Sequence, residues 1–193
     1  MNNIIEPQNI AFDIDGVFID VMSLFIKIAE KDYNIRNIKV EDITSYMLEE
    51  CLNIEAELVN EIIDKIIDKK HDFEIEAIDH SAETLKKIAN ASGEVLFITA
   101  RPRIGHIREW IANQLYPFDK DRIEIVATGS FEPKAELLIS KSKKYFLEDR
   151  LETCFDLHKA GITPILYKQP WNRKAHHFME VASWKELDAL IDF

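Results

Sequence analysis

Two aspartates stand where a short apolar run near the N-terminus ends. The run covers residues 9–14 and is rich in strand-forming residues, and Gly16 after it permits a tight change of direction. Asp13 and Asp15 would therefore lie at the carboxyl end of a buried strand. A carboxylate can attack phosphorus and form an aspartyl-phosphate if the repulsion between two anions is relieved. Residues two apart on a strand point to the same face, so Asp15 could lie beside Asp13 and transfer protons.

Further polar residues follow later apolar runs in the same way. Thr99 ends the run EVLFIT and Arg101 comes two residues later, Glu148 and Asp149 follow the run YFL, and Lys134 begins a predicted helix. The Thr99 hydroxyl can donate to a phosphoryl oxygen, and the Lys134 ammonium can stabilise negative charge in the transition state. Magnesium would relieve the anionic repulsion, because it binds one or two carboxylates, here Asp13 and Asp149, together with substrate phosphate. One acidic pair after a strand is equally typical of a turn or helix cap, but four such placements favour a site.

The framework that these residues need is a parallel sheet. Short apolar runs alternate with helical patterns after about residue 80, which predicts a parallel sheet with helices on both faces and right-handed crossovers. In such sheets the ligand site lies beyond the carboxyl ends of the strands, so the candidate residues would meet at one rim. We expect strands at residues 9–14, 94–99, 123–127, 145–147 and 163–167, and helices at residues 82–91 and 105–115, after Pro133, at residues 151–160 and after Ser183, whose capping box includes Glu186.

The segment between the first strand and this alternating part has a different pattern. Apolar residues recur at helical spacing from Val21 to about Lys70, with Glu, Asp and Lys between them. We interpret this segment as a helical insertion, so that residues 1–20 and 80–193 would form the core and residues 21–79 a separate cap. With 193 residues, the chain has room for one compact core and such an insertion.

The charge and composition of the chain argue against several classes of function. A formal net charge of −11 argues against general binding to nucleic acid polymers or anionic membranes, which relies on clustered Lys and Arg. Cys51 and Cys154 are far apart in the sequence, which supports neither a disulfide framework nor a thiolate zinc site. The first residues lack a secretion-signal pattern, and no apolar stretch approaches the roughly 20 residues that span a bilayer. A cytoplasmic protein acting on a small molecule is therefore expected.

Four short motifs resemble, in order, those of the haloacid dehalogenase superfamily. They are DIDGV at Asp13–Val17, FITAR at Phe97–Arg101, Lys134, and LEDR at Leu147–Arg150, and with the terminal strands the resemblance covers nearly the whole chain. The resemblance implies a Rossmann-like, three-layer parallel sheet. It also implies that the helical insertion, which lies between the first and second motifs, is a cap that closes over the site and selects substrates.

The same resemblance implies a role for each motif residue. Asp13 would be the nucleophile and Asp15 the acid/base, while Thr99 and Lys134 would bind phosphate. Magnesium would be held by Asp13, Asp149 and the backbone carbonyl of Asp15. The acid at position 15 distinguishes this chain from the dehalogenases and transport ATPases of the superfamily, so phosphoester hydrolysis or phosphoryl transfer remains.

Some residues near these motifs leave more than one interpretation open. Glu148 stands where many relatives carry a second Asp, and it could reach the metal shell through water or orient Lys134. Trp171 in the QPWNR segment could wall the site or anchor a loop. His176 and His177 lack a third ligand at a suitable spacing, so we interpret them as a surface or capping pair.

The helical insertion, the TAR and EDR sequences and the QPWNR segment further resemble 5′-nucleotidases of the deoxyribonucleotidase type. In that case Ala100 and Arg101 would lie at the phosphate or sugar, and Phe18 and Tyr46 would stack on a nucleobase. Both aromatic residues could instead pack the cap against the core. The leading hypothesis is hydrolysis of a nucleoside 5′-monophosphate. A phosphatase for another small phosphate monoester, such as a sugar phosphate, and a catalytically silent binding protein are the alternatives.

Overall fold

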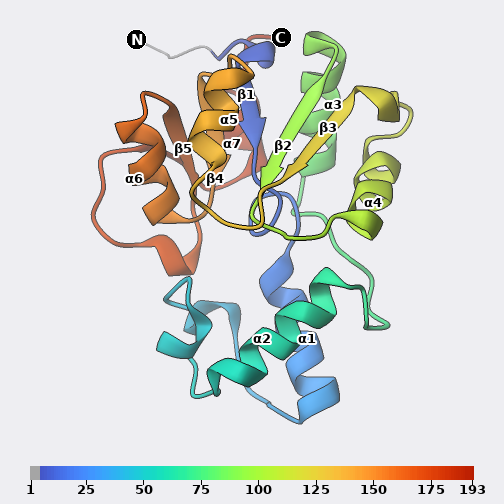
Figure 1. The fold of residues 1–193 in the computed structure, drawn as a ribbon, viewed down its shortest axis with the longest axis vertical. Coiled ribbons are helices and arrows are strands. Elements are labelled where there is room, and N and C mark those ends of the chain that lie inside the picture. Colours follow the sequence, from blue (N-terminus) through green and yellow to red (C-terminus); the bar gives the residue numbers. More distant parts are fainter. Residues whose placement is uncertain (1–4) are drawn as a thin grey trace.

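Six strands form one parallel sheet. The computed structural model describes residues 5–193 of the chain. The strands are β1 (Ile10–Phe12), β2 (Val95–Thr99), β3 (Ile123–Ala127), β4 (Tyr145–Glu148), β5 (Thr163–Tyr167) and β6 (Met179–Val181). They lie in the order β3-β2-β1-β4-β5-β6, so that the first strand is flanked by β2 and β4 (Figure 1). The predicted α/β class with a Rossmann-like parallel sheet is confirmed.

Helices cover both faces of this sheet and give the core three layers. These helices are α3 (Ser81–Ser92), α4 (Gly105–Leu115), α5 (Lys134–Ser140), α6 (Leu151–Lys159) and α7 (Trp184–Asp188). Successive side chains of a strand point to opposite faces of the sheet. Ala11 and Leu96 pack in the cluster that includes α5 and α6, whereas Phe12 and Phe97 pack in the larger cluster with α3, α4 and α7. Burial on both faces explains why these strands read as nearly continuous apolar runs.

Two further helices lie beyond the carboxyl ends of the strands. These are α1 (Val21–Tyr33) and α2 (Ala56–Ile67), and they stand apart from the helices that cover the sheet (Figure 1). We call residues 21–67 the helical lobe. Residues 34–55, which connect its two helices, contain short 3-10 turns and no α-helix. The insertion is therefore less helical than its sequence pattern suggests.

The chain leaves and re-enters the core along one narrow connection. Ile19 forms a bridge with Ala77, and the Asp20 N–H donates to the Glu76 carbonyl at 3.1 Å. The outgoing and returning segments therefore run side by side where the lobe meets the sheet. The cap boundaries at residues 21–79 stay a prediction, and this pairing lies close to both of them. Within the described part of the chain, no helix combines the length and apolar character needed to cross a bilayer.

Local sequence signals set several element ends. The helix α3 ends at Gly93, whose φ of +79° is the left-handed conformation that favours glycine at a helix end. The Ser183 hydroxyl accepts from the Glu186 N–H at 3.3 Å, as predicted, but the Glu186 carboxylate accepts from the Ala182 N–H at 2.7 Å and not from Ser183. The sequence does not predict β6, because a three-residue strand at the sheet edge is too short to show alternation.

Adjacent residues of α5 offer a matched test of the core. Leu138 is fully buried against the sheet, whereas Ile139 is 55% exposed. We expect Leu138→Ala to lower the free energy of unfolding by about 2–5 kcal/mol, because it leaves a cavity. Ile139→Ala should change it by less than about 0.5 kcal/mol. Urea unfolding of both variants measures this difference, and equal losses would contradict the assigned faces of α5.

Candidate active site

Three carboxylates are buried together at the carboxyl ends of two neighbouring strands. Asp13 follows β1, Glu148 ends β4 and Asp149 comes directly after it. Asp13 is 4% exposed and the other two are 1% exposed. One oxygen of each residue lies within 4.8 Å of the others. We call these three residues the acidic cluster, and its position at the strand ends agrees with the rim predicted from the sequence.

Lys134 supplies positive charge inside this acidic cluster. It is the first residue of α5 and is 1% exposed. Its ammonium lies 2.7 Å from Glu148 Oε2 and 3.0 Å from Asp13 Oδ1. The other Glu148 oxygen accepts a hydrogen bond from the Arg150 N–H at 3.0 Å. Of the two interpretations of Glu148, the structure therefore favours the one in which it orients Lys134.

One ammonium group does not balance three buried carboxylates. Burial raises the pKa of the Asp13 carboxyl to about 7, and the charges of Glu148 and Asp15 add to this shift while Lys134 opposes it. Burial, followed by the charges of Glu148 and Asp13, also raises the pKa of Asp149 well above its usual range. Burial alone would lower the pKa of Lys134, but the Asp13 and Glu148 carboxylates outweigh it and raise that pKa. Without a further cation, the cluster therefore retains protons near neutral pH.

The free oxygen atoms of the cluster suit a hard divalent cation. Among the described residues, Asp13 Oδ1 and Asp149 Oδ1 are buried without a hydrogen-bond partner. The Lys134 ammonium forms an ion pair with Asp13 Oδ1 at 3.0 Å, whereas Asp149 Oδ1 has no such neighbour among the ion pairs of the described residues. Buried polar atoms are normally satisfied, and a cation such as magnesium binds carboxylate oxygens. Asp13 and Asp149 therefore fit the metal site predicted from the sequence, while the backbone carbonyl of Asp15 as a further ligand stays a prediction.

The Asp15 carboxylate is paired with Arg101 and is not part of the acidic cluster. Arg101 donates from Nε to Asp15 Oδ2 at 2.7 Å and from Nη2 to Asp15 Oδ1 at 2.6 Å, which makes a two-pronged ion pair. Its remaining nitrogen, Nη1, is buried without a partner. The Thr99 hydroxyl oxygen accepts from the Arg101 N–H at 3.2 Å. The sequence places these residues at one rim but does not predict the pairing.

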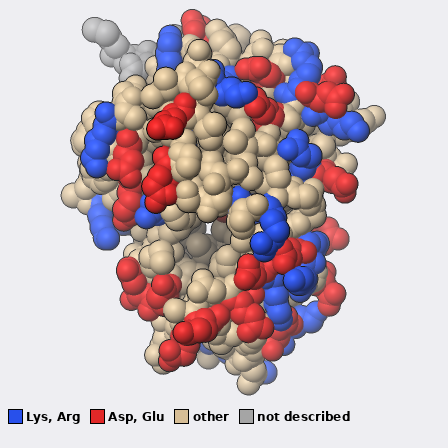
Figure 2. Space-filling view, in the orientation of Figure 1, with Lys and Arg blue, Asp and Glu red and all other residues tan. Residues whose placement is uncertain are grey.

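A cavity of about 310 Å³ lies between the strand ends and the helical lobe. Figure 2 shows the hollow between these two parts of the molecule. Asp15, Ala100 and Arg101 reach the cavity from the sheet, and Tyr46 and Asn60 reach it from the lobe. Most of the remaining wall is apolar. A pocket with a few polar groups on an apolar wall is typical of a small-molecule site.

Phe18 lies in the core and does not line this cavity. Its side chain is fully buried, and its ring centroid lies 5.6 Å from that of Phe97 and 5.1 Å from that of Trp110. The expectation that Phe18 contacts a substrate finds no support, because its side chain is fully buried against core rings and does not line the cavity. Core packing, the alternative interpretation, agrees with the structure.

Tyr46 of the helical lobe contacts Arg150, the last residue of the fourth motif. Its ring lies edge-on to Phe131 with the centroids 5.7 Å apart. The guanidinium carbon of Arg150 lies 5.3 Å from the Tyr46 centroid and 4.3 Å from the Phe131 centroid. Such contacts between a cation and aromatic rings hold the lobe against the core at this point. No periodicity or motif in the sequence marks Phe131 or Arg150 for this contact.

Nearly the whole chain matches one family of known proteins. The family model described as 5′ nucleotidase, deoxy (pyrimidine), cytosolic type C protein matches residues 7–193. The chain belongs to this nucleotidase family. A Clostridium acetobutylicum protein named as a nucleotidase is 27% identical over 189 residues, which cover 97% of this chain and 95% of that protein.

Solved structures share the fold of this nucleotidase chain at low sequence identity. A predicted phosphoglycolate phosphatase from Haemophilus somnus 129PT has a TM-score of 0.62 and 13% identity, with 93% of this chain and 96% of that chain covered. A haloacid dehalogenase-like hydrolase from Streptococcus pneumoniae has a TM-score of 0.60 and 12% identity, with 98% and 99% covered. These likenesses show the haloacid dehalogenase fold. Together with the family match, they confirm that the chain is a phosphoric monoester hydrolase.

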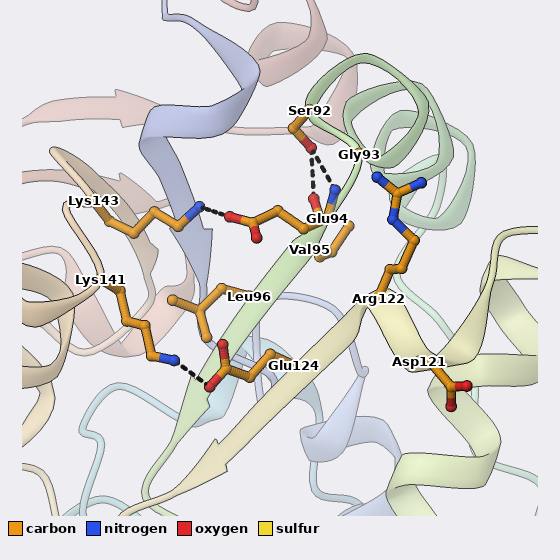
Figure 3. A pocket seen from close by; sticks show the side chains of 10 residues that line it. All are labelled: Ser92, Gly93, Glu94, Val95, Leu96, Asp121, Arg122, Glu124, Lys141 and Lys143. Carbon is orange, nitrogen blue, oxygen red and sulfur yellow. Dashed lines mark hydrogen bonds and ion pairs between the residues drawn. The ribbon is translucent and has the colours of Figure 1, made fainter.

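A larger cavity, of about 480 Å³, lies at the other end of the sheet. It opens where β2 and β3 begin, and none of the motif residues lines it. Figure 3 shows Lys143 directed at Glu94 and Lys141 directed at Glu124, at 2.8 Å and 2.6 Å respectively. These two ammonium groups are already paired with carboxylates, so neither is free for the phosphate of a nucleotide, and the remaining cation of the lining is the Arg122 guanidinium.

Protonation of the acidic cluster predicts how metal binding depends on pH. Below pH 7 the raised pKa of Asp13 keeps its carboxyl protonated, and a cation must displace that proton. We therefore expect the affinity for Mg²⁺ to rise with pH through about 7, by at most about tenfold per unit for each proton released, and to level off once Asp149 has also lost its proton. Calorimetric titration at pH 5.5 to 8.5, in two buffers with different ionisation enthalpies, measures affinity and proton release. A constant affinity with no proton release would contradict the protonated state of the cluster.

Proposed function

We propose that the protein is a magnesium-dependent phosphatase that forms an aspartyl-phosphate on Asp13 and hydrolyses nucleoside 5′-monophosphates. The observation that carries this proposal is the grouping of Asp13, Asp149 and Lys134 in one buried site, where each aspartate keeps an oxygen without a hydrogen-bond partner. A purely structural acidic pair would be satisfied by its neighbours, whereas a nucleophile and a metal ligand each need a free oxygen.

The proposed reaction has two steps that share the same aspartates. The reaction begins with Asp13 as a carboxylate and with Asp15 released from Arg101 and protonated. An Asp13 oxygen first attacks the phosphorus, the bond to the leaving alcohol oxygen breaks, and the Asp15 carboxyl gives that oxygen its proton. A water molecule then attacks the phosphorus and transfers a proton to Asp15, and the bond between phosphorus and Asp13 breaks. The products are the alcohol and inorganic phosphate, and both aspartates return to their starting states.

Lys134, Thr99 and the metal would stabilise the negative charge of the phosphoryl group. The Lys134 ammonium is 3.0 Å from Asp13 Oδ1, so it lies beside the proposed nucleophile. The Thr99 oxygen accepts from a backbone N–H, which leaves its own proton available to a phosphoryl oxygen. Asp13 and Asp149 would hold Mg²⁺, which when bound neutralises the repulsion between the carboxylate and the phosphate.

Asp15 can transfer protons only if Arg101 releases one of its oxygens. Both Asp15 oxygens accept from Arg101, and the third guanidinium nitrogen has no partner. Asp13 is 4% exposed and does not line the cavity, so an entering phosphate would first meet Asp15 and Arg101. Guanidinium binds phosphate in the same two-pronged way as carboxylate. Substrate phosphate would therefore compete for Arg101 and free Asp15 for its role.

The helical lobe supports a nucleotide as the substrate. We propose that residues 21–79 act as the cap, which closes the cavity on the side away from the sheet. The wall contains Tyr46, Phe131 and many aliphatic side chains, and such a wall suits the flat, mostly apolar faces of a nucleobase. The family description and the name of the Clostridium relative also indicate nucleotidase activity.

Phosphate release by the purified protein tests this proposal. The substrates are a panel of nucleoside 5′-monophosphates and sugar phosphates, each assayed with Mg²⁺ and with excess EDTA. We expect nucleotides to be hydrolysed and EDTA to abolish the rate, because the repulsion between Asp13 and the phosphate is then no longer relieved. Hydrolysis of sugar phosphates alone would reject the nucleotide part, and a rate unaffected by EDTA would reject the magnesium part.

Asp13→Asn and Asp121→Asn provide the matched comparison in this assay. Both replace a carboxylate by an amide, but Asp121 is exposed at the opposite end of the sheet. We expect Asp13→Asn to lower kcat by at least roughly 10³-fold, because the amide is a poor nucleophile, and Asp121→Asn to leave kcat unchanged. An active Asp13→Asn variant would show that Asp13 does not attack the phosphorus.

A further inference from the structure

The segment of residues 169–172, which follows β5, contacts the acidic cluster at Asp149. Three side chains of residues 169–172 donate hydrogen bonds to the loops that carry the first and fourth motifs. Trp171 Nε1 donates to Asp149 Oδ2 at 2.9 Å, and Asn172 Nδ2 donates to the Asp149 backbone carbonyl at 2.7 Å. Gln169 Nε2 donates to the Gly16 carbonyl at 2.7 Å. The segment therefore fixes both the backbone and the side chain of Asp149.

This segment is itself held rigidly. Trp171 is 6% exposed and Asn172 is 1% exposed. The Asn172 amide also donates to the Tyr167 carbonyl at 2.8 Å, and its oxygen accepts from the Gln169 N–H at 3.0 Å. Hydrogen bonds of buried groups are strong because no water competes for them. These hydrogen bonds fix Asn172, the residue next to Trp171, to Gln169 and to the end of β5.

The turn at Gly16 leaves room for this contact. Gly16 has a φ of +73°, and a Cβ atom there would overlap Asp149 Oδ2 and lie 3.1 Å from the Trp171 ring. Any larger residue would push the Asp149 carboxylate away from the indole. The first motif, the fourth motif and the segment after β5 are therefore packed around one carboxylate oxygen.

The indole contact decides which Asp149 oxygen is available. Oδ2 is occupied by the Trp171 N–H, whereas Oδ1 is buried without a partner. We propose that Trp171 is a positioning residue for metal binding, because its N–H fixes the Asp149 carboxylate and leaves Oδ1 for the cation. This inference rests on the proposed magnesium dependence. Groups that orient a metal ligand typically contribute 10- to 100-fold to affinity, which is the expected size of the effect.

Trp171→Phe separates positioning from packing. The substitution keeps an aromatic ring in the core and removes only the N–H donor. Trp184→Phe is the matched control, because Trp184 is also buried and donates to a backbone carbonyl, that of Val17, at 2.8 Å. We expect Trp171→Phe to raise the Mg²⁺ concentration for half-maximal rate by about 10- to 100-fold, with the rate recovering at high Mg²⁺ and KM for the substrate unchanged. Trp184→Phe should leave this Mg²⁺ dependence as in the wild type.

Nuclear magnetic resonance of the unmodified protein gives a readout that does not depend on activity. The chain has 3 tryptophans, and their indole N–H signals are assigned from the single Trp→Phe variants, or by elimination with Trp110→Phe and Trp184→Phe. We expect the Trp171 signal to shift most as Mg²⁺ is added without substrate. Its acceptor is the only one of the three that belongs to a proposed metal ligand, since the indole groups of Trp110 and Trp184 donate to backbone carbonyls.

The outcomes distinguish this inference from the proposed function. A wild-type protein that neither binds nor requires Mg²⁺ would overturn both of them. A wild type that requires Mg²⁺, with an unchanged Mg²⁺ dependence in Trp171→Phe or a Trp171 signal that stays fixed during the titration, would overturn only the role of Trp171. Loss of thermal stability in Trp171→Phe without a change in Mg²⁺ dependence would likewise identify Trp171 as a packing residue.

Discussion

The active site depends on one constraint, which is that more negative than positive charge is buried at the ends of β1 and β4. Asp13, Glu148 and Asp149 are buried together around a single ammonium, that of Lys134. Burying unbalanced charge is costly, so the site must take up protons, as the raised pKa of Asp13 indicates, or a cation. The same imbalance gives the site its chemistry, because a bound cation and Lys134 together would attract a phosphate that the acidic surface of the protein repels.

The fold creates this imbalance by topology. The strands β1 and β4 are neighbours in space although more than a hundred residues separate them, and both end at the same rim. The helix α5 begins beside them, so its first residue carries the ammonium into the cluster. The helical lobe, inserted just after β1, lies over the same rim (Figure 1). The position of the insertion therefore places the helical lobe directly over the charged centre.

The placement of the site residues is predictable from the sequence where backbone geometry alone decides it. Parallel strands bring their carboxyl ends together, so the meeting of Asp13 with Asp149 follows from the strand and helix pattern. Contacts that depend on side-chain rotamers were not predictable. The Arg101 guanidinium could equally have faced solvent or substrate, but it pairs with Asp15. The Trp171 indole donates to Asp149 only because the short turn after β5 folds back onto the acidic cluster. Phe18 shows the opposite case, in which a residue next to a motif belongs to the core.

We propose that the carboxylates of Asp13 and Asp149 share one divalent cation. Crystals grown with Mn²⁺ in place of Mg²⁺ decide this, because manganese gives an anomalous signal that locates the ion without reference to activity. We expect one strong anomalous peak between these two carboxylates, which disappears in crystals of Asp149→Asn. A map from metal-dependent enzyme with no peak there, or with its peak elsewhere in the molecule, would contradict it.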